Sequence, residues 1–190
     1  MDARPETKSA LGSYSDKELI AAINGGESVA FEVLYHRHRD WVISLAYRFT
    51  GDRELALDVL QEVFLYFLRK FPGFQLTANL RTFFYPAVRN LSLTARRKTR
   101  RFQSSEAELE QIEGCAAPNP VLPGREQLAA TLGCLSEDHR EVLLLRFVDG
   151  LKLGEIAEAL ELPLGTVKSR LHNALETLRR DERTKKYFEP

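Results

Sequence analysis

Residues 153–171, LGEIAEALELPLGTVKSRL, form the most informative stretch of the chain. Ile156, Ala157 and Leu160 recur at helical spacing, and Val167 and Leu171 resume that spacing after a break at residues 161–165. Two short helices joined by a tight turn, the second polar on its outer side, are typical of a helix-turn-helix that reads the DNA major groove. A plain helical hairpin is the structural alternative. The outward positions of the second helix are Thr166, Lys168, Ser169, Arg170, His172 and Asn173.

The residues before this motif predict four more helices in an N-terminal domain. A capping box at residues 15–18 opens the first, which residues 24–26 (NGG) stop. The second is a long amphipathic helix ended by Gly51, and Asp52 caps the third. Residues 71–73 (FPG) break the third, and the fourth runs from about Asn79 to near Arg97.

A polar segment separates this domain from the helix-turn-helix domain. Residues 102–126 are acidic and contain three prolines, so we predict a flexible linker with a helical piece near residues 105–112. Beyond it, Ser136 is a candidate cap for a helix that ends at residues 149–150 (DG). The fold class expected is all-α, with two small helical domains on a linker. The expected ranges are a disordered N-terminus at 1–14, domains at 15–101 and 127–186, the linker at 102–126 and a tail at 187–190.

The formal net charge of zero, from 27 basic and 27 acidic residues, is a cancellation. Residues 81–101 carry seven basic side chains and no acidic one, and residues 166–186 carry seven basic and three acidic ones. Between them lies the acidic stretch 102–138. Two basic blocks indicate two surfaces that face a polyanion, with ordinary solvated helix faces as the alternative.

Composition excludes several classes of protein. No apolar run is long enough for a membrane helix, and the first residues lack the apolar core of a secretory signal, so we expect a cytoplasmic protein. Cys115 and Cys134 cannot make a disulfide scaffold or a four-ligand zinc site. The sequence does not indicate a role for either cysteine. No cofactor or metal is expected.

Two sets of motifs resemble the extracytoplasmic-function (ECF) group of bacterial RNA polymerase sigma factors. Residues 141–150 (EVLLLRFVDG), 155–157 (EIA) and 165–172 (GTVKSRLH) resemble the C-terminal DNA-binding sigma-4 domain of that group. The sigma-2 domain of the same group has similar motifs to five segments of the N-terminal half. These segments are residues 16–20 (DKELI), 30–35 (AFEVLY), 58–65 (DVLQEVFL), 89–90 (RN) and 96–97 (RR). Their order and spacing also fit. The resemblance implies a factor that binds core RNA polymerase and directs initiation at promoters with minus-ten and minus-thirty-five elements.

The resemblance assigns a partner to the helix that contains residues 58–65. In this family that helix docks on the β′ clamp of the polymerase, and the sigma-4 domain meets the β flap. Acidic groups beside an exposed apolar side chain suit a basic helical partner. A solvated acidic face is the alternative. The candidate polymerase contacts are Asp58, Gln61, Glu62 and Leu65.

The resemblance also makes residues 74–101 the surface that recognises the minus-ten element and the melted non-template strand. Aromatic rings can stack on unpaired bases and basic groups hold phosphates, although Phe83 and Phe84 are equally suited to a core. Pro86 departs from the family pattern and should kink the helix or start a new one. The candidate contacts are Phe74, Gln75, Asn79, Arg81, Arg89, Arg96 and Arg97.

The second helix of the helix-turn-helix should read the minus-thirty-five element through the six outward residues named above. Two residues depart from the family here. Glu161 stands where a turn glycine is usual, so the turn must form without a residue that adopts a positive φ easily. Pro163 replaces the usual serine cap and can start a helix with its fixed φ.

Other functions remain as alternatives. A stand-alone helix-turn-helix regulator with an N-terminal sensor domain is the nearer one. An enzyme is not expected, because His36 and His38 lie on different sides of one helix and no phosphate loop or nucleophile motif occurs.

The resemblance further implies an anti-sigma factor as a partner, and promoter DNA in duplex and melted form.

Overall fold

The structure, a computed structural model, describes residues 11–106, 132–181 and 184. The chain divides into two compact units, one on each side of the gap at 107–131, and helices are the only regular elements in the described parts. The two expected helical domains are therefore present. The predicted tail at 187–190, Cys115 and most of the predicted linker lie outside the described residues.

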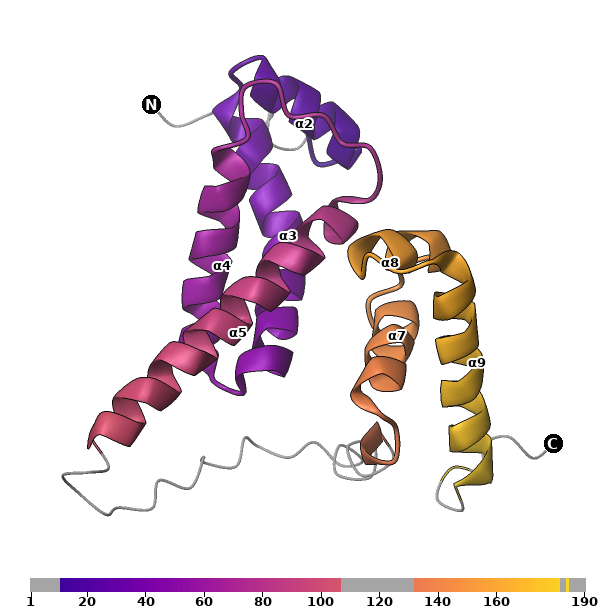
Figure 1. Ribbon diagram of the computed structural model, residues 1–190. Coiled ribbons are helices and arrows are strands. Elements are labelled where there is room, and N and C mark those ends of the chain that lie inside the picture. The colour runs from indigo at the N-terminus through magenta and orange to yellow at the C-terminus, as the bar shows by residue number, and fades with distance from the viewer. Residues whose placement is uncertain (1–10, 107–131, 182–183, 185–190) are drawn as a thin grey trace. The chain divides into compact units, whose positions relative to one another are not determined.

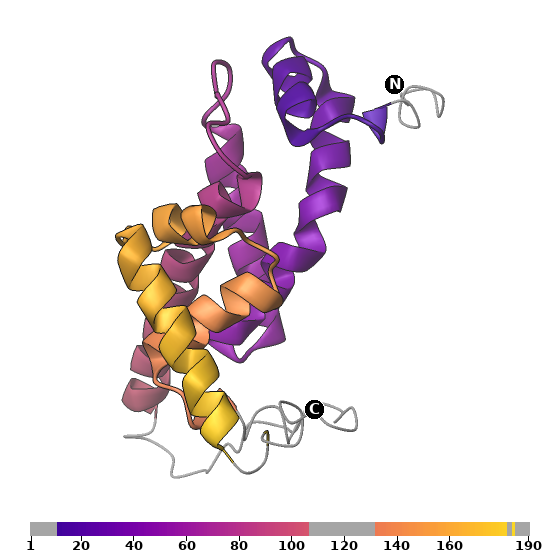
Figure 2. The same ribbon diagram turned by 90° about the vertical axis from the view of Figure 1, so that its right-hand side faces the viewer.

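The first unit contains α2 (Asp16–Asn24), α3 (Ser28–Thr50), α4 (Arg53–Leu68) and α5 (Leu80–Glu106). Helices α3, α4 and α5 pack against one another, and α2 packs on α3 at one end of this bundle (Figure 1). Figure 2 shows the same helices turned by a quarter. The core is built from apolar residues at helical spacing, including Leu34, Val42, Leu45, Val63, Phe67 and Phe84.

Local capping signals determine where these helices begin and end. The hydroxyl of Ser15 accepts from the amide of Glu18, whose carboxylate accepts from the amide of Ser15 at 2.7 Å, which confirms the capping box. Asp52 caps α4 by accepting from the amides of Glu54 and Leu55. Gly51 ends α3 with φ at 71°, the left-handed conformation expected of it.

Two expectations for the first unit were wrong. Residues 11–14 are part of the fold, since Leu11 is buried and the carbonyl of Gly12 accepts from Arg37. Helix α5 continues to Glu106, five residues past the expected domain end, and Pro86 lies inside it without starting a new helix. Burial of Phe84, Tyr85 and Val88 on either side of the proline holds the helix together there.

The second unit contains α7 (Glu137–Phe147), α8 (Leu153–Ala159) and α9 (Leu164–Arg180). All three pairs of helices are in contact. Ser136 caps α7 as expected, by accepting from the amide of His139. Buried Leu135 and Leu143 pack with Ala174 and Leu178 of α9. The predicted helix-turn-helix is thus formed by α8, the turn at residues 160–163 and α9.

The turn between α8 and α9 is made at a residue that does not favour a positive φ. Glu161 adopts φ of 53°, so the turn does use the left-handed region, without a glycine. The amide of Glu161 donates to the carbonyl of Glu158 and that of Leu162 to the carbonyl of Ala157. These two bonds form a Schellman motif, which satisfies helix-end carbonyls and offsets the strain at Glu161. Pro163 takes the N-cap position of α9 and makes no side-chain cap.

In the described ranges, none of the helices combines the length and hydropathy needed to cross a membrane.

Candidate functional site

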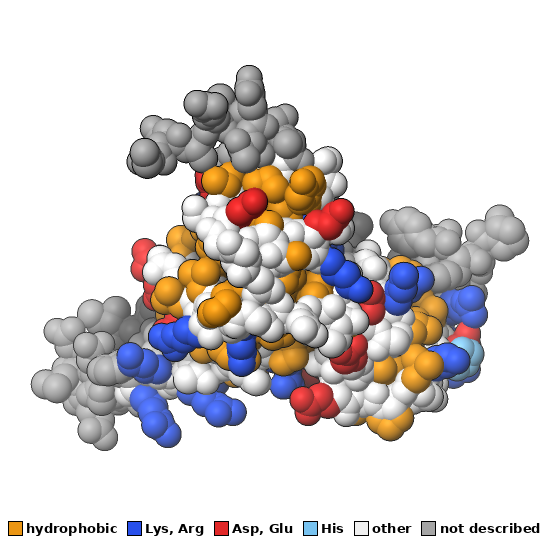
Figure 3. Space-filling view, turned by 90° about the horizontal axis from the view of Figure 1, so that it is seen from above, with side chains coloured by type: hydrophobic (Ala, Val, Ile, Leu, Met, Phe, Trp, Pro, Cys, Tyr) orange, Lys and Arg blue, Asp and Glu red, His pale blue; other side chains and the backbone are white. Residues whose placement is uncertain are grey.

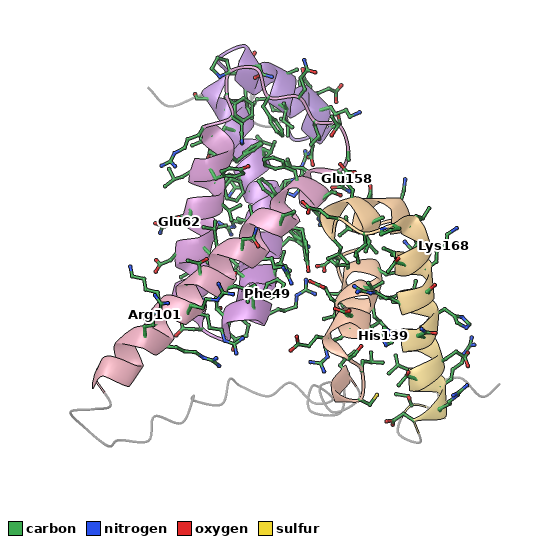
Figure 4. The ribbon with its side chains drawn as sticks, viewed as in Figure 1. Phe49, Glu62, Arg101, His139, Glu158 and Lys168 are labelled. Carbon is green, nitrogen blue, oxygen red and sulfur yellow. The ribbon has the colours of Figure 1, made fainter. Side chains whose placement is uncertain are left out.

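Helix α4 presents a continuous exposed face made of the predicted polymerase contacts. Asp58, Gln61, Glu62 and Leu65 are all exposed, while the intervening Val59, Leu60, Val63 and Phe64 are buried. Figure 4 shows Glu62 on the outer side of the helix. Leu65 is 53% exposed, and Leu68, one turn further on, is 40% exposed. Two acidic groups therefore lie beside a pair of exposed leucines, a combination that suits a partner helix with basic and apolar side chains.

The loop between α4 and α5 contains three of the predicted minus-ten contacts, and the structure gives them different roles. Gln75 is exposed. Phe74 is half-buried, with its ring centroid 5.3 Å from that of Phe67, 5.7 Å from Phe71 and 4.9 Å from Phe83. Phe74 therefore supports the loop from beneath and is not an open stacking surface for a base.

Asn79 is exposed, and it also forms hydrogen bonds at the start of α5. Its side-chain oxygen accepts from the amide of Arg81 at 2.9 Å, and its carbonyl accepts from Thr82 and Phe83. Asn79 thus caps the first turn of α5, and its side-chain NH₂ group is the part left to meet a base.

The aromatic residues at the start of α5 divide between core and surface. Phe84 is fully buried. Phe83 is half-buried and stacks on Tyr66 of α4 with an interplanar angle of 12°. Arg81 lies over the ring of Trp41, 5.5 Å from its centroid, which orients the guanidinium across α3.

The remaining basic residues lie along the rest of α5. Arg89, Arg96 and Arg97 are exposed, as are Lys98, Arg100 and Arg101. The guanidinium of Arg96 lies 3.5 Å from the carbonyl oxygen of Phe49. Figure 4 shows Arg101 near the far end of the helix, and a group of Lys and Arg side chains appears at one edge of the view in Figure 3. Charges of one sign along a helix this long can follow a nucleic-acid backbone over several phosphates.

Helix α9 presents four of the six predicted minus-thirty-five contacts on one exposed stripe. Lys168, Ser169, His172 and Asn173 are exposed, and Figure 4 shows Lys168 pointing away from α7. Val167, Ala174 and Leu178 hold the opposite side of the helix in the core. The hydroxyl of Ser169 donates to the carbonyl of Gly165 in the preceding turn.

The other two predicted contacts flank this stripe. Thr166 is half-buried at the first turn of α9. Arg170 is also half-buried, and its guanidinium forms an ion pair with Asp138 of α7 at 2.6 Å. Arg170 therefore joins two helices of the unit, which sets it apart from the exposed Lys168.

An ion-pair cluster joins α2 to α3 at the start of the first unit. Asp16 accepts from His38 at 2.8 Å and from Arg37 at 2.7 Å, and His38 is buried. Burial acts to raise the pKa of Asp16, but hydrogen bonds and electrostatic attraction from His38 and Arg37 outweigh it and lower the pKa. Likewise, the hydrogen bonds from Ser15 lower the pKa of Glu18. Of the acidic residues in the motif at 16–20, Asp16 therefore holds α2 against α3, whereas Glu18 completes the cap of α2.

Sequence reasoning missed three residues of these surfaces. Leu68 shares the face of Leu65 at i+3, a spacing that was visible in the sequence. Thr77 is exposed in the loop, where residues 75–79 alternate between exposed and half-buried positions. Asn24 forms hydrogen bonds to this loop from about fifty residues away, and no local pattern indicates that contact.

Two family models match the chain in the order of its two units. Sigma-70 region 2 matches residues 34–102, and sigma-70 region 4 matches residues 125–178. These ranges contain every residue of the two surfaces predicted in the first unit and of the one predicted on α9.

Individual relatives agree over nearly the whole chain. The chain is 29% identical to the ECF RNA polymerase sigma factor SigW of Bacillus subtilis, over 88% of its length and 96% of that protein. It is 30% identical to the ECF RNA polymerase sigma-E factor of Escherichia coli K12, over 86% of its length and 92% of that protein. Among solved structures, the sigma factor RpoE from Bartonella quintana, which was solved in complex with the anti-sigma factor NepR, has the same fold. The TM-score is 0.57 and the sequence identity is 22%. The match covers 78% of this chain and 94% of that one.

Proposed function

Because the chain belongs to the ECF group of RNA polymerase sigma factors, which direct transcription initiation at promoters, we propose that its two units bind core polymerase and a bipartite promoter together. The first unit would bind the polymerase clamp through α4 and the minus-ten element through the loop and α5. The second would bind the minus-thirty-five element through α9. The observation that carries this proposal is that each unit presents most of its candidate contacts on an exposed helix face, whose opposite side is buried in the core of that unit.

The α4 face is the proposed clamp contact. Asp58 and Glu62 supply negative charge, Gln61 supplies hydrogen bonds, and Leu65 with Leu68 supplies apolar area. Apolar side chains that lose water on docking contribute most of the affinity, whereas the acidic residues select a basic partner and speed its approach.

The loop and α5 are the proposed minus-ten contact. The side chains of Gln75 and Thr77 can hydrogen-bond to the edge of an unstacked base, as can the side-chain NH₂ group of Asn79. Arg89, Arg96 and Arg97 can hold the phosphates on either side. Because Phe84 is buried and the half-buried Phe74 packs against other rings, base recognition would depend on hydrogen bonds more than on stacking.

The exposed stripe of α9 is the proposed minus-thirty-five contact. Lys168 and Asn173 are suited to guanine and adenine edges or to phosphates, and His172 and Ser169 add further donors. Since residues 107–131 tether the two DNA-binding units, each raises the effective concentration of the other at one promoter.

A regulatory partner is part of the proposal. The Bartonella quintana relative was solved in complex with an anti-sigma factor, and the exposed apolar residues of this chain would need cover when polymerase is absent. An anti-sigma factor that covers the α4 face would compete directly with the clamp.

Reconstitution with core polymerase tests the function. Purified full-length protein should co-purify with core RNA polymerase and support run-off transcription from promoters selected out of a library, whereas core enzyme alone should not. Specific duplex binding without polymerase, and no transcription with it, would instead support the stand-alone regulator. That alternative is not favoured, since sigma-70 region 2 matches residues 34–102 of the N-terminal half.

A further inference from the structure

Asn24, the last residue of α2, uses both ends of its side-chain amide on one distant loop. Its Nδ2 group donates to the carbonyl of Phe74 at 2.8 Å, and its Oδ1 atom accepts from the amide of Gly73 at 2.7 Å. Figure 1 shows the loop after α4 passing alongside α2. The side chain therefore pairs two adjacent backbone groups of a segment that has no strand or helix partner of its own.

The same point of the loop is held from its other side by aromatic packing. The ring of Phe74 sits among Phe67, Phe71 and Phe83, with centroid separations between 4.9 and 5.7 Å. Gly73 has φ of +100°, a conformation that only glycine adopts readily, and a Cβ atom there would meet nothing within 4 Å. Backbone conformation, and not lack of space, requires glycine next to Asn24.

The far end of the loop is held as well, because Asn79 caps α5. The stretch between these two anchors is only a few residues long and contains the exposed Gln75 and Thr77. With both ends held, the backbone that carries Gln75 and Thr77 is confined between the two anchors.

We propose that Asn24 is a positioning residue for promoter selectivity, which holds the loop so that Gln75 and Thr77 meet the unpaired minus-ten base in one orientation. This inference rests on the proposed function of the loop. Asn24 itself touches no DNA in this scheme and acts through the backbone of Gly73 and Phe74. Removing its amide would let the loop sample several orientations, which lowers the preference for one base over another more than it lowers binding overall.

The first test uses the free protein and does not depend on its function. Hydrogen exchange at the Gly73 amide, measured by NMR on the full chain, should be about tenfold or more faster in Asn24→Ala than in the wild type, because the amide loses its acceptor. The Glu18→Ala variant is the matched control, since it removes the capping box of α2 but leaves the loop contacts in place. Unchanged exchange at Gly73 in Asn24→Ala would overturn the inference.

The second test measures selectivity in the reconstituted holoenzyme. Run-off transcription is compared between the promoter preferred by the wild type in library selection and single-base variants of its minus-ten element. For Asn24→Ala we expect the ratio between the preferred and the substituted base to fall about three- to tenfold, the change that corresponds to the loss of one neutral hydrogen bond. Core-polymerase affinity should remain unchanged.

Two further variants separate positioning from folding. Asn24→Asp keeps an acceptor for Gly73 but cannot donate to Phe74, so it should lose part of the selectivity. Gly73→Ala strains the loop while α2 stays intact, and it should reproduce the loss seen in Asn24→Ala. Equal loss in Glu18→Ala would show that stability of α2 is responsible and would overturn the inference. If the wild type failed to support transcription with core polymerase, the proposed function would be contradicted instead. The hydrogen-exchange result at Gly73 would still show whether Asn24 holds the loop.

Discussion

The guanidinium of Arg170 in α9 lies 2.6 Å from a carboxylate oxygen of Asp138 in α7. Arg170 belongs to the sequence motif expected to bind DNA, but its partner belongs to the helix that supports the recognition helix. The ion pair holds α9 against α7 near the start of the exposed stripe of α9. It therefore positions Lys168 and Asn173, which lie on that stripe.

For Arg170 we therefore expect a contribution to stability. Arg170→Ala and Asp138→Ala should each lower the stability of the second unit by about 0.5–1 kcal/mol, since the pair is partly exposed. The double variant should lose no more than the larger single loss. Native-state hydrogen exchange of the α7 and α9 amides measures this, and strictly additive losses would mean that the two side chains do not interact.

Lys168 should behave differently, because it is exposed on the stripe. Lys168→Ala in the holoenzyme should weaken promoter binding and reduce the slope of log affinity against log salt by about one, the value for one phosphate contact. Filter-binding titrations at several salt concentrations give the slope. Glu158→Ala, an exposed change on α8, is the control, and an unchanged slope in Lys168→Ala would remove Lys168 from the contact set.

On α4, the double charge reversal Asp58→Lys/Glu62→Lys should lower the affinity for core polymerase by about tenfold or more, since like charges would face the basic partner. Leu65→Ala should also weaken binding by removing apolar contact area. Asp40→Lys is the matched control on α3, where Asp40 is 79% exposed. Fluorescence anisotropy of labelled protein with core enzyme is the measurement, and equal loss from Asp40→Lys would indicate a general charge effect.

Glu161 is a site where a substitution should raise stability. Glu161→Gly should stabilise the second unit by about 0.5–1 kcal/mol, because glycine adopts φ of 53° without strain. Glu158→Gly, inside α8, should instead destabilise it by about 1 kcal/mol. Amide exchange in α8 and α9 reports both changes, and a loss of stability in Glu161→Gly would show that the glutamate side chain makes a favourable contact there.

The first unit should lose stability in acid through Asp16. The pKa of this carboxyl is lowered from its usual value of 3.8, so its contribution is complete above that value and is lost as the pH falls through the folded-state pKa. Urea unfolding followed by the single tryptophan, Trp41, between pH 6 and 3 measures the effect. Asp16→Asn should flatten this pH dependence, and an unchanged dependence in Asp16→Asn would show that another group is responsible.

Much of the fold was predictable because its signals are local. The capping box at Ser15, the cap at Asp52 and the left-handed Gly51 act within one helical turn, and each lies where the sequence indicated. The exposed face of α4 followed from helical periodicity for the same reason. The end of α5 was placed too early, since its polar C-terminal half has no apolar pattern to mark its end.

The amino-acid sequence by itself determined the helices, the order of the two units and the candidate surfaces, because caps and apolar periodicity depend on neighbours within a few residues. Only the tertiary structure decided which members of those surfaces are available to a partner. The ion pair of Arg170 spans 32 positions, the ring of Phe74 packs in a cluster drawn from two helices and a loop, and Asn24 meets its loop across about 50 positions. Such contacts are set by how helices pack in space, which no short window of sequence contains.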